Sequence, residues 1–159
     1  MTRFRRSIVA IAGVLGVGAM LAGAAGAVGT SAGKPDKGVI YFATTHSAHG
    51  ITYAAGNATD SVFGTQAVTY AIKTAPTRTG SVKITAKPVT TWTTSGTLSG
   101  TATATLTVAA NGKATFTNGK VSETKGTGTL KGHSLAATFT GSGDTKTGTY
   151  KITYRGTYK

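Results

Sequence analysis

Hydrophobic and polar residues alternate along most of the chain beyond residue 38. The clearest run is 97–108, where Leu98, Gly100, Ala102, Ala104, Leu106 and Val108 share one face and Ser or Thr occupies each position between them. Similar alternation recurs at 68–73, 82–87, 135–140 and 149–159. Side chains of a β-strand point to opposite faces with a period of two. The pattern therefore predicts strands with one buried face, and no ten-residue segment after the N-terminal region shows helical periodicity.

Turn-forming residues divide these segments into candidate strands. The strands are expected near 38–43, 51–55, 64–74, 80–93, 96–109, 113–117, 121–131, 133–141 and 147–158. Asn111-Gly112 and Asn118-Gly119 predict tight hairpin turns. Connections this short favour antiparallel pairing between neighbours. We expect an all-β fold of seven to nine antiparallel strands.

A single antiparallel β-barrel is the preferred architecture, with a β-sandwich as the alternative. A last strand that runs to Tyr158 could close the sheet against the first. Long strands also suit a tilted barrel wall. Small residues at 100, 102 and 104 would leave room inside for Trp92 or the tyrosines. Pro88 interrupts its segment and predicts a bulge or an edge position.

The N-terminus has the pattern of an export signal. Basic residues Arg3, Arg5 and Arg6 precede an uncharged run from Ile8 to Val28 that ends in Gly and Ala. This order is typical of a secretory signal peptide over 1–27, cleaved near Ala27 so that the secreted protein begins at Val28. An uncleaved membrane anchor is the alternative. Arg5-Arg6 leaves both the general secretory and the twin-arginine routes open. We expect a flexible leader at 28–37 and the β domain at 38–159.

Composition narrows the function classes. The chain has 159 residues, 17 Lys+Arg against 4 Asp+Glu, a formal net charge of +13 and no cysteine. The missing thiols exclude a disulfide scaffold, thiolate metal sites and a Cys nucleophile, and export without cysteine suggests a bacterial source. Positive charge favours anionic partners such as cell-wall polymer or lipid headgroups. The candidate contacts are alternating strand positions, namely Lys83, Lys87, Lys151 and Arg155. Specific nucleic-acid binding is not expected, because no recognition motif is present.

Few side chains in the sequence could act in catalysis or bind a metal. We expect Asp36 and Asp144 to be solvated turn residues, and Glu123 to be an exposed strand residue among lysines. Asp60 with Glu123 is the only conceivable pair of catalytic carboxylates. His46 and His49 lie in a segment that is expected to be a loop, and no third metal ligand is evident nearby, so they are expected to be surface histidines. We therefore assign no catalytic residue, no metal and no cofactor.

The stretch from Tyr53 to Gly64 is the least strand-like part of the domain. It combines polar and aromatic side chains, and such a loop could frame the mouth of a barrel. The candidate ligand-binding residues are Tyr53, Asn57, Asp60 and Phe63. An ordinary connecting loop is the alternative.

Three Gly- and Thr-rich segments carry a family resemblance. They are 126–133 (GTGTLKGH), 138–141 (TFTG) and 150–158 (YKITYRGTY). The sequence resembles small secreted β-proteins of high-GC Gram-positive bacteria, and its plan is loosely similar to allene oxide cyclase and dirigent-type barrels. The resemblance implies a barrel fold but no activity, since fold does not fix function.

Two function classes follow from these observations. The first is a secreted, non-enzymatic binding or surface-interaction barrel that could contact an anionic cell-surface polymer. The alternative is a small barrel enzyme of cyclase or isomerase type that works through the shape of its cavity. A third idea, binding of ice or a crystal surface, rests on the single threonine ladder at 101, 103, 105 and 107.

Overall fold

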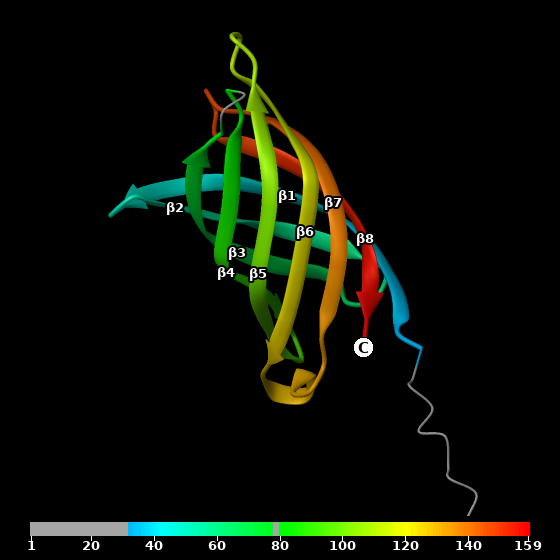
Figure 1. Ribbon diagram of the computed structural model, residues 1–159. Helices are drawn as coiled ribbons and strands as arrows, with labels where there is room; N and C mark the ends of the chain where they lie inside the picture. The colour runs from blue at the N-terminus through cyan, green and yellow to red at the C-terminus, as the bar shows by residue number, and fades with distance from the viewer. Residues whose placement is uncertain (1–31, 78–79) are drawn as a thin grey trace, which may run out of the picture. The chain divides into compact units, whose positions relative to one another are not determined.

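The computed structural model describes residues 32–77 and 80–159, and they form a closed β-barrel (Figure 1). The predicted signal peptide at 1–27 and its cleavage site before Val28 lie outside the described residues. The elements are β1 (Lys34–Ala48), β2 (Ile51–Asp60), β3 (Gly64–Pro76), β4 (Val82–Thr93), β5 (Gly96–Val108), β6 (Lys113–Gly126), the short 3₁₀ helix η1 (Gly128–Leu130), β7 (Leu135–Asp144) and β8 (Thr149–Tyr158).

Each strand pairs antiparallel with the next, and β1 also pairs with β8 to close the sheet. The closing register places Lys34 opposite Tyr158 and Ala43 opposite Thr149. The predicted all-β antiparallel barrel is therefore confirmed, with eight strands rather than a sandwich. Closure leaves no edge strand, so every strand has a partner on both sides.

Several strand boundaries differ from expectation, and β1 and β2 run on to Ala48 and Asp60 instead of ending near 43 and 55. β1 begins at Lys34, so residues 34–37 of the expected leader belong to the strand and pair with β8. The expected strands 113–117 and 121–131 are replaced by one strand, β6, which ends at Gly126 and is followed by η1. Within β6, Asn118-Gly119 forms a bulge instead of the predicted turn. Asn118 has a φ of 52° there, a conformation that Asn tolerates better than most residues.

Pro88 lies in a second bulge, as predicted. The register of β4 against β5 shifts between Ala86 and Val89. Proline has no N–H to donate to the neighbouring strand. In the bulge, no inter-strand hydrogen bond is needed from this position. The shift also changes which residues face inward, because Ala86, Val89 and Thr91 are all buried.

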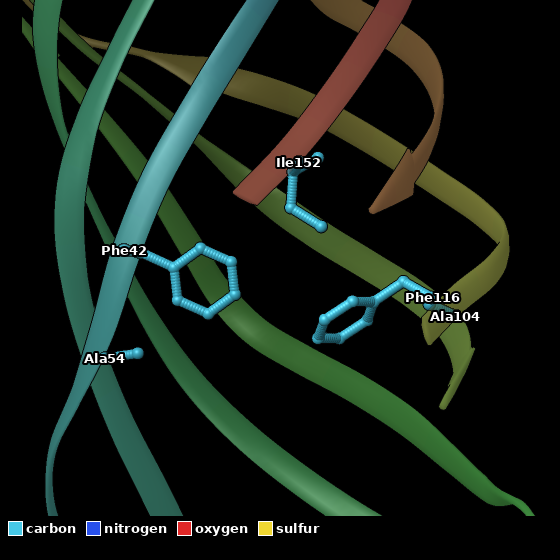
Figure 2. Close-up of a cluster of buried hydrophobic side chains, with 5 residues drawn as sticks. All are labelled: Phe42, Ala54, Ala104, Phe116 and Ile152. Carbon is cyan, nitrogen blue, oxygen red and sulfur yellow. The ribbon is translucent and has the colours of Figure 1, made fainter. Parts of the chain in front are cut away.

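Apolar side chains fill much of the barrel interior. One cluster consists of Phe42, Ala54, Ala104, Phe116 and Ile152, and Figure 2 shows these side chains pointing inward from several strands. Phe42 packs with Tyr70 and Tyr150 at ring-centroid distances of 5.1 Å each. The expected inward placement of small residues is correct for Ala102 and Ala104. Trp92 was expected inside, but its side chain is 51% exposed and its indole N–H donates to Thr69.

The barrel has one plugged end. There, η1 places Leu130 against Leu98 and Leu135, and Phe63 and Tyr158 pack around this cluster. Gly96, with a φ of 142°, lets the β4–β5 turn approach η1, because a Cβ there would lie 2.1 Å from the Thr127 carbonyl oxygen. The opposite end is formed by the hairpins at 49–50, 109–112 and 145–148. Ala114 and Phe116 are buried toward that end, but other interior side chains there are only partly buried, among them Ile72, Ile84, Leu106 and Tyr150.

Candidate functional site

The predicted mouth loop is not a loop. Tyr53, Asn57 and Asp60 belong to β2, and the connection to β3 is limited to the turn at 61–63. Tyr53 stacks on His46 at 4.5 Å, and Asn57 is exposed, whereas Asp60 points inward and Phe63 packs in the plugged end. The alternating faces of β2 separate these side chains, so the structure does not bring the four candidates into one site.

The predicted cationic contacts fall into two separate pairs. Lys83 and Lys87 are exposed on β4, while Lys151 and Arg155 are exposed on β8. These strands are four positions apart in a closed ring of eight, so they occupy opposite walls of the barrel. Lys151 lies 5.4 Å from the centre of the Tyr41 ring on β1.

Carboxyl groups are concentrated inside the barrel. Asp36 is 2% exposed and Glu123 is 1% exposed, so the expectations that they are solvated were wrong. Asp36 is buried because β1 starts earlier than expected and pairs with β8. Glu123 points inward because the bulge at Asn118-Gly119 reverses the alternation along β6. Asp144 is the acid that stays at the surface, as expected, where it pairs with Lys113 at 3.1 Å.

Asp60 anchors a buried polar network near the plugged end. Its Oδ1 accepts hydrogen bonds from the backbone N–H groups of Val62 at 2.8 Å and Phe63 at 2.6 Å. Its Oδ2 accepts from the Gln66 amide and, at 2.8 Å, from the Tyr154 hydroxyl. Four donors satisfy an ionised carboxylate.

Tyr154 links Asp60 to Asp36. Its hydroxyl oxygen also lies 3.3 Å from Asp36 Oδ2, and Asp36 Oδ1 accepts from Ser61. A hydroxyl has one proton to donate. If that proton goes to Asp60, the remaining contact is satisfied when Asp36 is protonated and donates to Tyr154. Burial, and next the nearby Asp60 charge, raise the pKa of Asp36, which agrees with this arrangement.

Glu123 lies apart from that network. The Thr91 hydroxyl is 3.0 Å from Oε1 and 3.2 Å from Oε2. Burial raises the pKa of Glu123 to about 7, against a smaller opposing effect of the Thr91 hydrogen bonds. The Glu123 charge also contributes, after burial, to a raised pKa of Tyr70. A carboxyl group that titrates near neutral pH is therefore held inside the barrel.

A cavity of about 80 Å³ lies inside the barrel. Its walls are mostly aliphatic and aromatic, and its polar lining includes Glu123, Thr91, Gln66 and Tyr154. Gln66 is 6% exposed, and its Oε1 has no hydrogen-bond partner. Asp60 is not among the lining residues in the part of the chain that the structure describes, so the conceivable carboxylate pair Asp60 and Glu123 does not share this cavity.

The outer wall over β5–β8 carries a basic depression. Lys120 and Arg155 line it together with hydroxyl groups, among them Thr103 and Thr138. The register aligns Lys120 with Thr138, Thr138 with Arg155, and Arg155 with Lys37 on β1. Neighbouring strands lie about 4.8 Å apart, so these three cations form one transverse row.

No group of three or more His, Asp or Glu residues that could hold a metal occurs within 32–77 and 80–159. His46 belongs to β1, and His49 forms the β1–β2 turn with a φ of 52°. Over the same two ranges, no helix is long and apolar enough to cross a membrane.

Comparisons with family models, with curated proteins and with solved structures found no match to this chain. Sequence reasoning missed Glu123, Thr91 and Gln66 as interior polar residues. The inward direction of Thr91 and Glu123 depends on the bulges in β4 and β6, and only Pro88 signals either bulge in the sequence. Gln66 lies in regular alternation with Val68 on β3, and that phase could have placed it inside.

Proposed function

We propose that this chain is a secreted, non-enzymatic binding barrel whose basic outer wall contacts an anionic cell-wall polymer. The supporting observation is the separation of charge between the inside and outside of the barrel. Every described Lys and Arg is exposed, whereas Asp36, Asp60 and Glu123 point inward. The outer surface is therefore more uniformly basic than the composition alone implies.

The polymer is placed over the row Lys37, Arg155 and Lys120, continued along β8 by Lys151. Lys151 and Arg155 share a face of β8, where residues two apart are separated by about 7 Å. The hydroxyl groups of the depression can donate hydrogen bonds to phosphate oxygens. Lys83 and Lys87 lie on the opposite wall, so one extended polymer segment cannot contact both pairs together.

The double variant Lys120→Gln with Arg155→Gln is expected to bind purified wall teichoic acid about 5- to 30-fold more weakly than the unchanged protein. Exposed ion contacts contribute up to about 1 kcal/mol each. The matched control is Lys83→Gln with Lys87→Gln, which removes equal charge from the opposite wall and should bind nearly normally. Equal losses in both variants would contradict the placement.

A salt titration tests the electrostatic origin of the contact. The Debye length falls to about 3 Å at 1 M salt, so binding of the unchanged protein should then be nearly abolished. Salt-independent binding would overturn the proposal. Binding to anionic vesicles without binding to the polymer would assign the surface to lipid headgroups instead.

A small barrel enzyme of cyclase or isomerase type is the second candidate. Glu123, with a pKa near 7 in an apolar cavity, favours it, because acid–base catalysts work best near the operating pH. The cavity of about 80 Å³ is small beside the roughly 300–1,000 Å³ of common ligand pockets. The small volume favours the binding function over an enzyme of this type.

A further inference from the structure

Two interior acceptors remain incompletely satisfied in the cavity. Among the described residues, Thr91 donates hydrogen bonds to Glu123, although an ionised carboxylate offers about four acceptor positions. Gln66 donates its amide N–H to Asp60, which fixes the orientation of the amide group. Its Oε1 is left buried without a partner. Buried polar atoms of this kind are uncommon and call for an explanation.

The cavity lining can carry negative charge but no compensating positive charge among the described residues. The lining contains the Glu123 carboxyl group and no Lys, Arg or His from 32–77 and 80–159. Among the residues that the structure describes, ionised Glu123 therefore has no counter-ion in the cavity lining. The aromatic rings of Phe42, Tyr70 and Phe116 also line the cavity, and the faces of aromatic rings attract cations.

The cavity volume limits the size of an occupant. An engineered protein cavity of about 150 Å³ accommodates benzene, and the present cavity, at about 80 Å³, is roughly half as large. An occupant with about four heavy atoms fits this space. The partly buried residues Ile72, Ile84 and Leu106 lie toward the end opposite the plug, which makes that end the route of entry.

We propose that the barrel interior is a binding site for a small alkylammonium ion. Its ammonium group pairs with Glu123, and its remaining N–H groups reach the Gln66 Oε1 directly or through one water molecule. Its alkyl chain packs against Phe42 and Phe116. This site is independent of the outer wall and adds a cationic ligand to a protein whose surface favours anions.

Calorimetric titration with n-propylammonium chloride at pH 8, where Glu123 is ionised, tests the proposal. We expect saturable binding with a millimolar or sub-millimolar Kd, as suits a ligand of four heavy atoms. The neutral analogue 1-propanol should bind at least tenfold more weakly, because it lacks the charge-assisted contact, and propionate should not bind. Equal binding of the amine and the alcohol, or no saturation by about 50 mM amine, would overturn the proposal.

Two substitutions locate the site. Glu123→Gln should weaken propylammonium binding at least tenfold, whereas Asp144→Asn, the same chemical change at the surface, should leave it unchanged. Ala102→Leu fills the cavity while keeping the carboxyl group, and it should abolish binding of both amine and alcohol. Retained amine binding by Glu123→Gln, or by Ala102→Leu shown to be folded by circular dichroism, would refute an interior site.

Discussion

Replacing Glu123 with glutamine should stabilise the barrel at pH 8 by about 3 kcal/mol and leave its stability unchanged at pH 4. Glutamine retains the size of the side chain and can still accept the Thr91 hydrogen bond. The pKa of Glu123 rises on folding from its ordinary value of 4.5 to about 7, and each unit corresponds to about 1.4 kcal/mol. The substitution removes the cost of holding a charge among apolar side chains.

The pH range of this effect follows from the direction of the shift. A group whose pKa is raised by folding stabilises the protein fully below its unfolded pKa, and that contribution is lost as the pH rises through the folded pKa. The difference between the two proteins should therefore develop between about pH 4.5 and 7. Asp36, whose pKa is also raised, affects both proteins alike and cancels in the difference.

Urea unfolding at several pH values measures this effect. Asp144→Asn is the matched control, because it makes the same acid-to-amide change at a surface carboxylate whose pKa is lowered by the Lys146 N–H and by Lys113. It should show no gain in stability at pH 8. A Glu123→Gln protein that is no more stable than the unchanged protein at pH 8 would show that water or a counter-ion reaches the carboxylate.

Leu98→Ala should destabilise the barrel by about 3 kcal/mol. Leu98 is 0% exposed and packs with Leu130 and Leu135 in the plugged end. Truncating a buried leucine loses its transfer free energy and leaves a cavity, at a cost of about 3–5 kcal/mol where the surroundings cannot collapse. The closed strand ladder on either side of Leu98 restricts such a collapse.

The same change near the other end of the barrel provides the comparison. Leu106 lies on the same strand but is only partly buried, so Leu106→Ala should cost about 1 kcal/mol. Chemical denaturation of both variants gives the two free energies of unfolding. Equal losses would contradict the description of one plugged end and one less tightly packed end.

The strands could be predicted because the alternation along β5 and β8 is regular over ten residues or more. A closed barrel could be favoured over a sandwich because the last alternating segment runs to Tyr158, and it does pair with β1. The start of β1 could not be found, because Lys34-Pro35-Asp36-Lys37 has no apolar alternation. Its pairing with β8 overrides that local composition.

The inward direction of Thr91 and Glu123 could not be predicted from the sequence for a different reason. One extra residue in a strand exchanges its inward and outward faces. Asn118-Gly119 is a common hairpin signal, and nothing local distinguishes a turn from a bulge there. In β6 a second register shift lies between Glu123 and Lys125, so Glu123 points inward while Lys125 is exposed.

The pairing of Lys34 with Tyr158 brings the two ends of the barrel sequence onto neighbouring strands, about 5 Å apart. A linker of a few glycines could therefore join Gly33 to Lys159, and the chain could be reopened at the His49-Gly50 turn without breaking a strand. In such a circular permutant, β8 and β1 are consecutive strands that form a hairpin. β2 and β1 are then the first and last strands, and their pairing closes the barrel. The place where the first and last strands meet therefore depends on the order of the chain, and the closed ring of strands has no fixed beginning.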